Sequence, residues 1–209
     1  LRCDHDCHYC QVSRVPENKK RYDLEEKHIN GILEHVNFLS DSFIKIEFQG
    51  GEPLLNFDFI RRFFDASESK LMGKKVEYVI ATALGPVNEE MLEWIQDKGI
   101  HLSVSFDGPR AIHSQNRPSR SFNSYDNTID NVRLIRERFS AISVSLLSTI
   151  TKQSLEVPEQ IVDGYLELGD NNLFIRPLSP YGFASDTWGV LGYSADEFMA
   201  FYKKLIAYI

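Results

Sequence analysis

The stretch that decides the fold is Ile44-Lys45-Ile46-Glu47-Phe48-Gln49-Gly50-Gly51-Glu52-Pro53. Its first half alternates apolar with charged residues, which predicts a β-strand, and the Gly-Gly-Glu-Pro that follows predicts a turn. Asn56 can then cap a helix, whose apolar residues recur at helical spacing: Phe59, Ile60, Phe63 and Phe64. A strand, a glycine turn and a helix therefore form one unit.

The same unit recurs along the chain. Apolar runs predict further strands at 76–83, 101–106, 142–150 and 173–176. Helical spacing predicts helices at about 24–39, between Asn88 and Gly99, around 129–135, from Pro158 to near Gly169, and after Ser194. Strands that alternate with helices specify an α/β fold with a parallel sheet and right-handed crossovers.

Capping patterns predict where several of these helices begin. Asp23 with Glu26, and Ser194 with Glu197, have the capping-box spacing. We also expect Asn56 and Asn88 to act as N-caps.

Length and charge exclude several classes of protein. A chain of 209 residues, 43% of them hydrophobic, can bury one core, so we expect a single domain over residues 1–209. The 30 acidic residues outnumber the 23 basic ones, which argues against a nucleic-acid partner. No run of eighteen apolar residues occurs, so we expect no membrane partner and a cytoplasmic protein.

The two ends of the sequence suggest an excised core. The chain begins next to a cysteine-rich loop and stops inside an apolar helical pattern over 197–209. We expect a domain that is truncated at both ends, with a first strand largely missing and a C-terminal extension absent.

All three cysteines, Cys3, Cys7 and Cys10, lie within eight positions near the amino terminus. Three thiolates at this spacing can converge on a soft metal centre. In one interpretation His5 or His8 adds the fourth ligand of a structural zinc site. In the other, the cysteines hold an iron-sulfur cubane with one iron open to an outside ligand.

The cysteine spacing, with Tyr9 before the last cysteine, resembles the cluster loop of the radical S-adenosylmethionine (radical SAM) superfamily. This resemblance implies that Cys3, Cys7 and Cys10 bind a [4Fe-4S] cluster and that SAM chelates its fourth iron. It also implies a partial (β/α)6 TIM-like barrel. The cluster loop of this fold emerges at the carboxyl ends of the strands, where ligands of parallel sheets bind.

Further residues match motifs of that superfamily. Gly50, Gly51 and Glu52 resemble its GGEP motif, which receives the SAM amino group, and two glycines let a ligand approach the backbone. Gln49 matches a position that reaches the ribose, and Ser105 matches the serine of S-x-D-G-P, which contacts SAM. The resemblance places the aromatic Tyr9 among the cofactor-binding residues as well.

Other polar residues follow the strands that we predict. Thr82, Thr149 and Arg176 stand at strand ends and could face the cofactor, Arg176 by a bidentate bond to the methionyl carboxylate or else as a structural ion pair. The presence of Asp107 in Asp-Gly-Pro fits a turn residue and a ligand equally well. His113 and Arg117 match the H-x-x-x-R pattern found after this motif in a resembling branch, and we assign them to loop ordering or substrate approach. The sequence identifies no catalytic acid or base.

Segments 7–14 and 174–183 most resemble the radical SAM maturase of the His-Xaa-Ser peptide system. This resemblance implies an oxidoreductase that generates a 5'-deoxyadenosyl radical from SAM and modifies a ribosomal peptide or protein, with flavodoxin or ferredoxin as the reductant. One alternative is an enzyme like the anaerobic sulfatase maturases, or one that acts on a small metabolite. The non-enzyme alternative is a structural zinc module or an electron-carrier iron-sulfur module.

Overall fold

The computed structural model describes residues 1–12 and 14–209 and shows an α/β fold around one curled, parallel five-stranded sheet. Ser13, part of the segment 7–14 that carries the finer resemblance, lies outside the described residues. The strands follow one another in space in chain order: β3 (Phe43–Phe48), β4 (Lys75–Thr82), β5 (His101–Ser105), β6 (Val144–Ile150) and β7 (Ile175–Pro177). The arrangement is the predicted partial TIM-like barrel.

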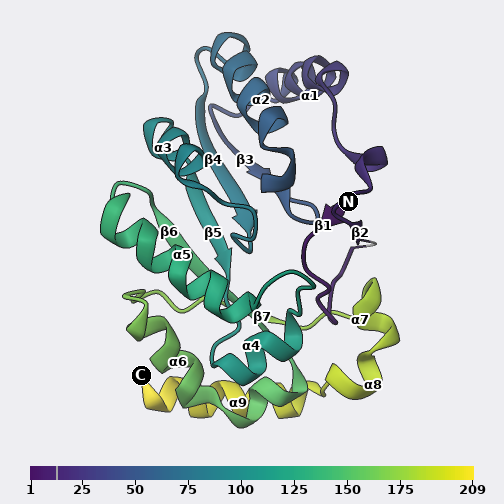
Figure 1. The fold of residues 1–209 in the computed structure, drawn as a ribbon, viewed down its shortest axis with the longest axis vertical. Coiled ribbons are helices and arrows are strands. Elements are labelled where there is room, and N and C mark those ends of the chain that lie inside the picture. The colour runs from purple at the N-terminus through teal and green to yellow at the C-terminus, as the bar shows by residue number, and fades with distance from the viewer. Residues whose placement is uncertain (13) are drawn as a thin grey trace.

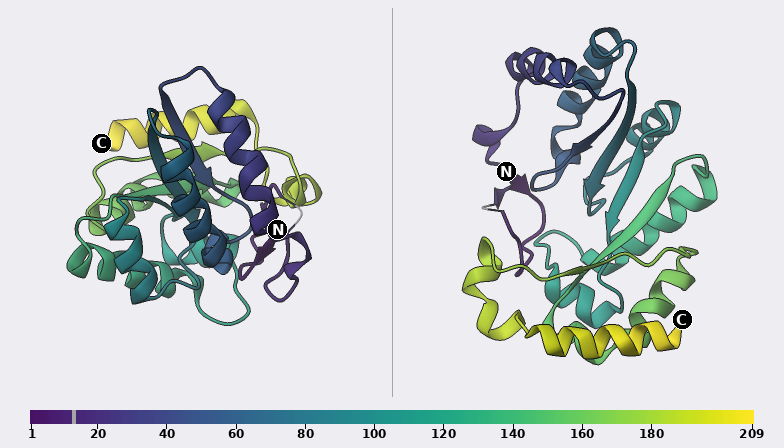
Figure 2. Two further views of the ribbon diagram at one scale, coloured as in Figure 1. Left: turned by 90° about the horizontal axis from the view of Figure 1, so that it is seen from above. Right: turned by 180° about the vertical axis from the view of Figure 1, so that it is seen from behind.

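Helices connect these strands and flank the sheet (Figures 1 and 2). The α-helices are α1 (Glu26–Phe38), α2 (Phe57–Lys70), α3 (Glu89–Asp97), α4 (Arg110–Asn116), α5 (Ser124–Arg138), α6 (Pro158–Glu167), α7 (Phe183–Asp186), α8 (Trp188–Leu191) and α9 (Ala195–Tyr208). Short 3-10 helices occur at η1 (Lys20–Tyr22), η2 (Pro53–Asn56) and η3 (Lys152–Glu156). Among the described residues no helix has both the length and the apolar character needed to cross a membrane.

The hydrophobic core lies between the sheet and its helices. Ile80, Leu102 and Leu146 are fully buried on the helix-facing side of their strands. Helix residues such as Leu92 and Val132 pack against them. The opposite, concave side of the sheet carries polar residues, because side chains alternate between the two faces of a strand.

Several predicted helix signals are confirmed and two are wrong. Asn88 caps α3 by accepting from the Met91 amide at 2.9 Å, and Ser194 forms the predicted capping box of α9 with Glu197. The α1 capping box is instead made by Glu25 with His28, because Asp23 is held by Arg2 at 2.8 Å.

Asn56 forms no side-chain cap either. Its amide donates to the Leu24 carbonyl at 3.0 Å and ties η2 to the chain before α1.

Two segments for which the sequence predicted no helix contain helices. The segment after Pro109 forms α4, and the segment over 177–193 contains α7 and α8. These helices are 7, 4 and 4 residues long, which is too short for apolar periodicity to reveal them.

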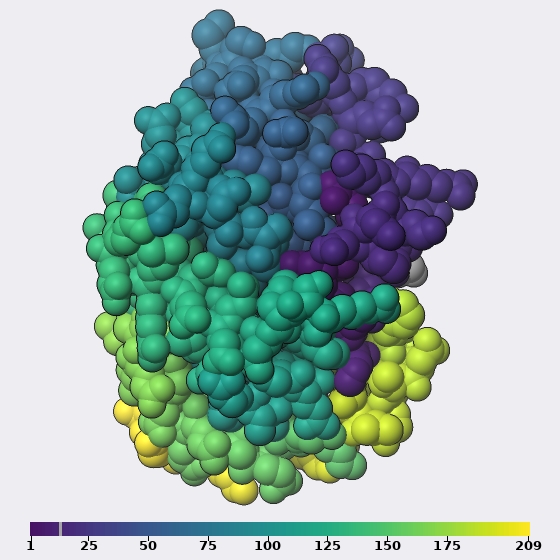
Figure 3. All heavy atoms as spheres, in the orientation of Figure 1, coloured from purple at the N-terminus to yellow at the C-terminus, as the bar shows by residue number. Residues whose placement is uncertain are grey.

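The amino-terminal segment lies at the carboxyl ends of the strands, beside their arrowheads (Figure 1). Two short strands, β1 (Arg2–Cys3) and β2 (Val15–Pro16), pair in parallel at the base of the cysteine loop. The space-filling view shows this segment between the residues around 115–120 and those around 180–190 (Figure 3). Backbone bonds support that position, since the Asp6 amide donates to the Pro118 carbonyl at 2.7 Å and the Phe183 amide to the Cys10 carbonyl at 2.9 Å.

Candidate cofactor site

A cavity of about 260 Å³ lies between the cysteine loop and the carboxyl ends of the strands. Twelve residues that the sequence proposed as ligands of the cluster or of SAM line it: Cys3, Cys7, Tyr9, Cys10, Gln49, Gly50, Gly51, Glu52, Thr82, Ser105, Thr149 and Arg176. They come from the cysteine loop and from the ends of all five strands of the sheet. The parallel topology explains this gathering, because it places all strand ends at one edge.

The three cysteines are free thiols that open onto this cavity. Cys7 is buried, and Cys3 and Cys10 are half-buried. Burial raises the pKa of Cys7 to about 11 and that of Cys3 still further. The metal-free thiols of Cys3 and Cys7 therefore hold their protons at neutral pH, and a metal must displace these protons on binding.

The spacing of the sulfur atoms argues against a single zinc ion. Zinc–sulfur bonds of roughly 2.3 Å place the ligand atoms of a tetrahedral site within about 4 Å of one another. Among the described residues, the group whose ligand atoms all lie within 4.8 Å contains Cys3 with Asp4 and His5, and neither of the other cysteines. The three cysteine sulfurs therefore do not all lie within 4.8 Å of one another, which fits a larger, multi-iron centre better than a single ion.

Neither histidine of the loop offers a fourth zinc ligand. His5 uses both ring nitrogens, one against Asp4 Oδ1 at 2.8 Å and one against Ser124 Oγ at 3.1 Å. His8 is exposed and does not line the cavity. The cavity thus offers three cysteine sulfurs as ligands, which fits an iron-sulfur cubane.

The glycine turn after β3 packs against the backbone of the cysteine loop. A Cβ atom on Gly51 would lie 2.1 Å from the Arg2 carbonyl oxygen and 3.0 Å from the Cys3 Cβ. The Glu52 amide donates to the same carbonyl at 3.0 Å. From the sequence we expected this glycine to let a ligand approach the backbone. In the structure the backbone of the cysteine loop fills that space.

Glu52 is buried and braced by neutral donors. Its Oε1 accepts from the Leu54 amide at 3.0 Å and from Thr82 Oγ1 at 2.7 Å, and its Oε2 accepts from the Ala83 amide at 2.9 Å. Burial, with the nearby Asp4, raises the pKa of Glu52 to about 7. Three donors leave one acceptor position on Oε2 free for a further partner.

Thr82 contributes to this site through Glu52. Its hydroxyl proton goes to the glutamate, and its oxygen accepts from the Leu84 amide at 2.8 Å. A direct contact of Thr82 with a cofactor remains a prediction.

Asp107 is also buried, and its partners include a cation. Its Oδ2 accepts from Tyr9 Oη at 2.6 Å, Arg117 Nε at 3.1 Å and Asn116 Nδ2 at 3.2 Å. Its Oδ1 accepts from the Thr149 amide at 3.1 Å. These bonds join the cysteine loop to the ends of β5 and β6.

The network around Asp107 changes the interpretation of three predicted residues. Tyr9 lines the cavity, and its hydroxyl is committed to Asp107, while Arg117 lies over the Tyr9 ring at 5.2 Å. His113 is fully buried and accepts from the Asp107 amide at 3.3 Å. The sequence assigned His113 and Arg117 to loop ordering or to substrate approach, and these contacts support loop ordering.

The sequence missed Asn116 and Ser124, two buried members of the same region. Asn116 lies in α4, which apolar periodicity did not reveal, and Ser124 begins α5. The Asp-Gly-Pro sequence after β5 left a turn role and a ligand role open for Asp107, and no pattern pointed to partners so far away in the chain.

Arg176 and Gln49 lie on opposite sides of the cavity mouth. Arg176 donates to Gln11 Oε1 at 2.6 Å, and Gln49 donates to Glu47 Oε1 at 2.7 Å. Since Gln11 is neutral, Arg176 forms no ion pair with a carboxylate among the described residues. The structural ion pair that was the alternative role for Arg176 is thus not seen among the described residues.

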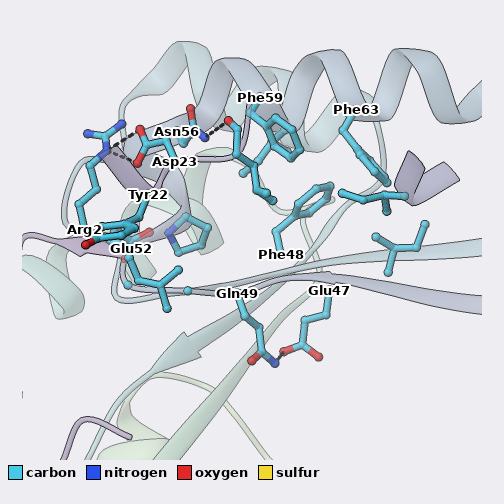
Figure 4. Close-up of a pocket in the computed structure, with 18 residues that line it drawn as sticks. Arg2, Tyr22, Asp23, Glu47, Phe48, Gln49, Glu52, Asn56, Phe59 and Phe63 are labelled. Atoms are coloured by element: carbon cyan, nitrogen blue, oxygen red, sulfur yellow. Dashed lines mark hydrogen bonds and ion pairs between the residues drawn. The ribbon is translucent and has the colours of Figure 1, made fainter. Parts of the chain in front are cut away.

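A second cavity, of about 220 Å³, lies on the other side of β3 (Figure 4). Phe48, Phe59 and Phe63 point into it, whereas Glu47 and Gln49 point to the opposite side of the strand. The Arg2–Asp23 ion pair closes one end. This apolar cavity shares the glycine turn with the first one and has none of its sulfur ligands.

Comparison with known proteins supports a family assignment. Residues 1–163 match the family model of the radical SAM superfamily. The radical SAM cyclopropyl synthase TigE of Paramaledivibacter caminithermalis is 26% identical over 72% of this chain and 34% of its own. An uncharacterized protein of Methanocaldococcus jannaschii is 28% identical over 86% of this chain, which spans 60% of that relative.

The fold is shared with solved structures at lower identity. The structure of anSMEcpe with bound AdoMet has a TM-score of 0.82 at 17% identity, over 99% of this chain and 57% of that one. Streptococcus suis SuiB bound to its precursor peptide SuiA has a TM-score of 0.71 at 19% identity, over 100% of this chain and 44% of that one. The chain thus spans about half the length of these structures.

The family model covers most of the chain, and the cavity offers a donor set that fits the cluster. The chain belongs to the radical SAM superfamily, whose cofactors are a [4Fe-4S] cluster and S-adenosylmethionine.

Proposed function

We propose that this chain is the core of a radical SAM peptide maturase and that Cys3, Cys7 and Cys10 bind its cluster. With both cofactors bound, reductive cleavage of SAM at the cluster supplies a 5'-deoxyadenosyl radical, which removes a hydrogen atom from the substrate. The observation that carries the proposal is the single cavity that brings the three thiols together with the glycine turn and Ser105.

The chain's own residues hold SAM in this proposal. Glu52 has one free acceptor position, which suits the methionyl ammonium. Arg176 has a charge that no carboxylate of the described residues neutralises, which suits the methionyl carboxylate. Gln49 and Ser105 line the same cavity and offer polar groups to the ribose and the rest of the cofactor.

Residues of the Asp107 network have a different task. They fix the cysteine loop to the ends of β5 and β6, beside the cavity, and so hold the cysteines in place. Buried, fully satisfied polar networks give this kind of rigidity.

We favour a peptide as the substrate that is modified. The anSMEcpe structures include one with a bound Kp18Cys peptide, and SuiB was solved with the precursor peptide SuiA. Segments 7–14 and 174–183 add the resemblance to the His-Xaa-Ser peptide system. A sulfatase as substrate is the second candidate, because a cysteine-type anaerobic sulfatase-maturating enzyme of Clostridium perfringens is 24% identical over 55% of the chain.

The test is cofactor cleavage followed by substrate identification. Anaerobically reconstituted protein with SAM and dithionite should release 5'-deoxyadenosine, and Cys7→Ala should not. Mass spectrometry of a His-Xaa-Ser-rich peptide after co-expression should then show a mass change. A fully loaded cluster that releases no 5'-deoxyadenosine would refute the radical chemistry, and an unchanged peptide would refute the substrate class alone.

A further inference from the structure

A chain of buried hydrogen bonds runs from the end of β5 to the first cysteine. The Asp107 amide donates to His113 Nδ1 at 3.3 Å, and His113 Nε2 lies 3.0 Å from Ser124 Oγ. Ser124 Oγ lies 3.1 Å from His5 Nε2, and His5 Nδ1 lies 2.8 Å from Asp4 Oδ1. His113, His5 and Ser124 are 0%, 1% and 3% exposed, so water does not replace these bonds.

The backbone amide at one end fixes the direction of every bond. An amide can only donate, so His113 Nδ1 accepts, and the proton of the neutral ring sits on Nε2. His113 Nε2 then donates to Ser124 Oγ, whose single proton goes to His5 Nε2. His5 therefore carries its proton on Nδ1 and donates to Asp4. His113, Ser124 and His5 each donate once and accept once, which is the single arrangement for two neutral imidazole rings.

Burial of the His113 ring agrees with this arrangement. Desolvation lowers its pKa to about 3, so the ring is neutral at physiological pH. Phe122 packs edge-on against the His5 ring at 5.3 Å and blocks an alternative orientation.

At its far end, this series of hydrogen bonds positions Asp4 beside Cys3. Asp4 Oδ1 lies 3.8 Å from Cys3 Sγ. Its second oxygen is buried with no hydrogen-bond partner among the described residues, and a Cβ on Gly85 would lie only 1.6 Å from it. Asp4 is thus wedged between His5 and the backbone of Gly85, next to the sulfur.

Hydrogen bonds to the backbone already hold the cysteine loop in place. The hydrogen-bonded side chains therefore act on the Asp4 side chain and not on the loop as a whole. The His8 amide donates to the Asn116 carbonyl at 3.0 Å, and Ser119 Oγ donates to the Asp4 carbonyl at 3.0 Å. These bonds fix the main chain and leave the Asp4 side chain to be oriented by His5.

We propose that Ser124 is a positioning residue for the cluster: by joining His113 to His5 it sets the Asp4 carboxylate beside the Cys3 sulfur. The proposal rests on the assignment of Cys3 to the cluster. A negative charge beside a cluster ligand disfavours addition of an electron, and net charge near the sulfurs is one determinant of the reduction potential. The series of hydrogen bonds from Asp107 to Asp4 therefore keeps the reduction potential of the cluster low.

The test compares two buried serines. Ser124→Ala removes the hydrogen-bond link between His113 and His5. Ser67→Ala removes an equally buried hydroxyl in α2, which bonds to the Phe64 carbonyl and to Tyr78 at 2.6 Å. Iron per chain and the midpoint potential, by redox titration followed with electron paramagnetic resonance, are measured on the full chain. We expect a less negative potential in Ser124→Ala, the parent value in Ser67→Ala, and recovery toward the parent value in Ser124→Thr.

A second variant decides the question if Ser124→Ala does not fold. His5→Asn keeps an amide at the Nδ1 position, near Asp4, and cannot reach Ser124, so it should also shift the potential to a less negative value. A parent-like potential in His5→Asn, or in a folded Ser124→Ala, would overturn the inference. A parent protein that binds no iron-sulfur cluster would instead refute the proposed function itself.

Discussion

Two buried carboxylates, Glu52 after β3 and Asp107 after β5, stand at the same edge of the sheet with different partners. Asp107 accepts from a cation, Arg117, as well as from neutral donors. Glu52 accepts from three neutral donors and forms no ion pair among the described residues. A neutralised carboxylate is an anchor, and one with an unmet charge is suited to a cationic ligand. From this difference we propose that Asp107 belongs to the scaffold and that Glu52 binds the cofactor.

The largest effect should come from Asp107→Asn. The substitution leaves Arg117 buried without its counter-charge, and breaking such a pair costs about 3 to 5 kcal/mol. Urea unfolding of the metal-free protein measures the loss. Asp126→Asn is the control, because Asp126 pairs with Arg110 at the surface, where a pair is worth about 1 kcal/mol or less. Equal losses in the two variants would contradict the anchor role.

Glu52 should make the metal-free protein less stable as the pH rises. Its pKa is about 7 in the native state against 4.5 ordinarily, so the native state holds the proton more tightly. This contribution is fully present below pH 4.5 and is lost as the pH rises to about 7, at a cost on the order of 2 to 3 kcal/mol. Glu52→Gln should remove this slope.

The measurement is the free energy of unfolding from pH 4.5 to 7.5 for the parent and for Glu52→Gln. The difference between the two curves isolates Glu52 from other titrating groups, such as His113, whose lowered pKa acts in the opposite direction. Glu47→Gln, in the same cavity, is the control and should keep the parent slope. Identical slopes in the parent and Glu52→Gln would remove the distinction between the two carboxylates.

Gly51→Ala should cost about 1 to 3 kcal/mol, because its Cβ would meet the Arg2 carbonyl and neither backbone can move freely. The control is Gly31→Ala in α1, where a Cβ meets nothing within 4 Å and should stabilise the helix by up to about 1 kcal/mol. Thermal unfolding with iron analysis measures both. Normal stability and cluster content in Gly51→Ala would show that the turn and the cysteine loop are not coupled.

Arg176→Gln should have the smallest effect on stability, within about 0.5 kcal/mol, because the side chain is exposed. SAM binding should weaken about tenfold, which corresponds to roughly 1.4 kcal/mol and is typical of a lost charge-assisted bond. Equilibrium binding to the reconstituted protein gives the dissociation constant, with Arg110→Gln as a surface control. Unchanged affinity would contradict a contact between Arg176 and the methionyl carboxylate of SAM.

The sequence predicted the parts of the molecule that follow from local pattern and topology. Alternation located the strands, and the parallel order brought the residues at 3, 52, 105 and 176 to one cavity. It did not predict which of them touch one another. Asp107 meets Tyr9, 98 residues away, and Glu52 meets Thr82, 30 residues away, and these bonds depend on side-chain placement in three dimensions.

The central claim is that the cavity holds a cluster with one iron open to SAM. Electron paramagnetic resonance of the reduced, reconstituted protein before and after addition of SAM tests it most directly. We predict about four irons per chain and a reduced-cluster spectrum that changes when SAM is added. A cluster whose spectrum is the same with and without saturating SAM, or a protein that retains zinc in place of iron, would contradict the account.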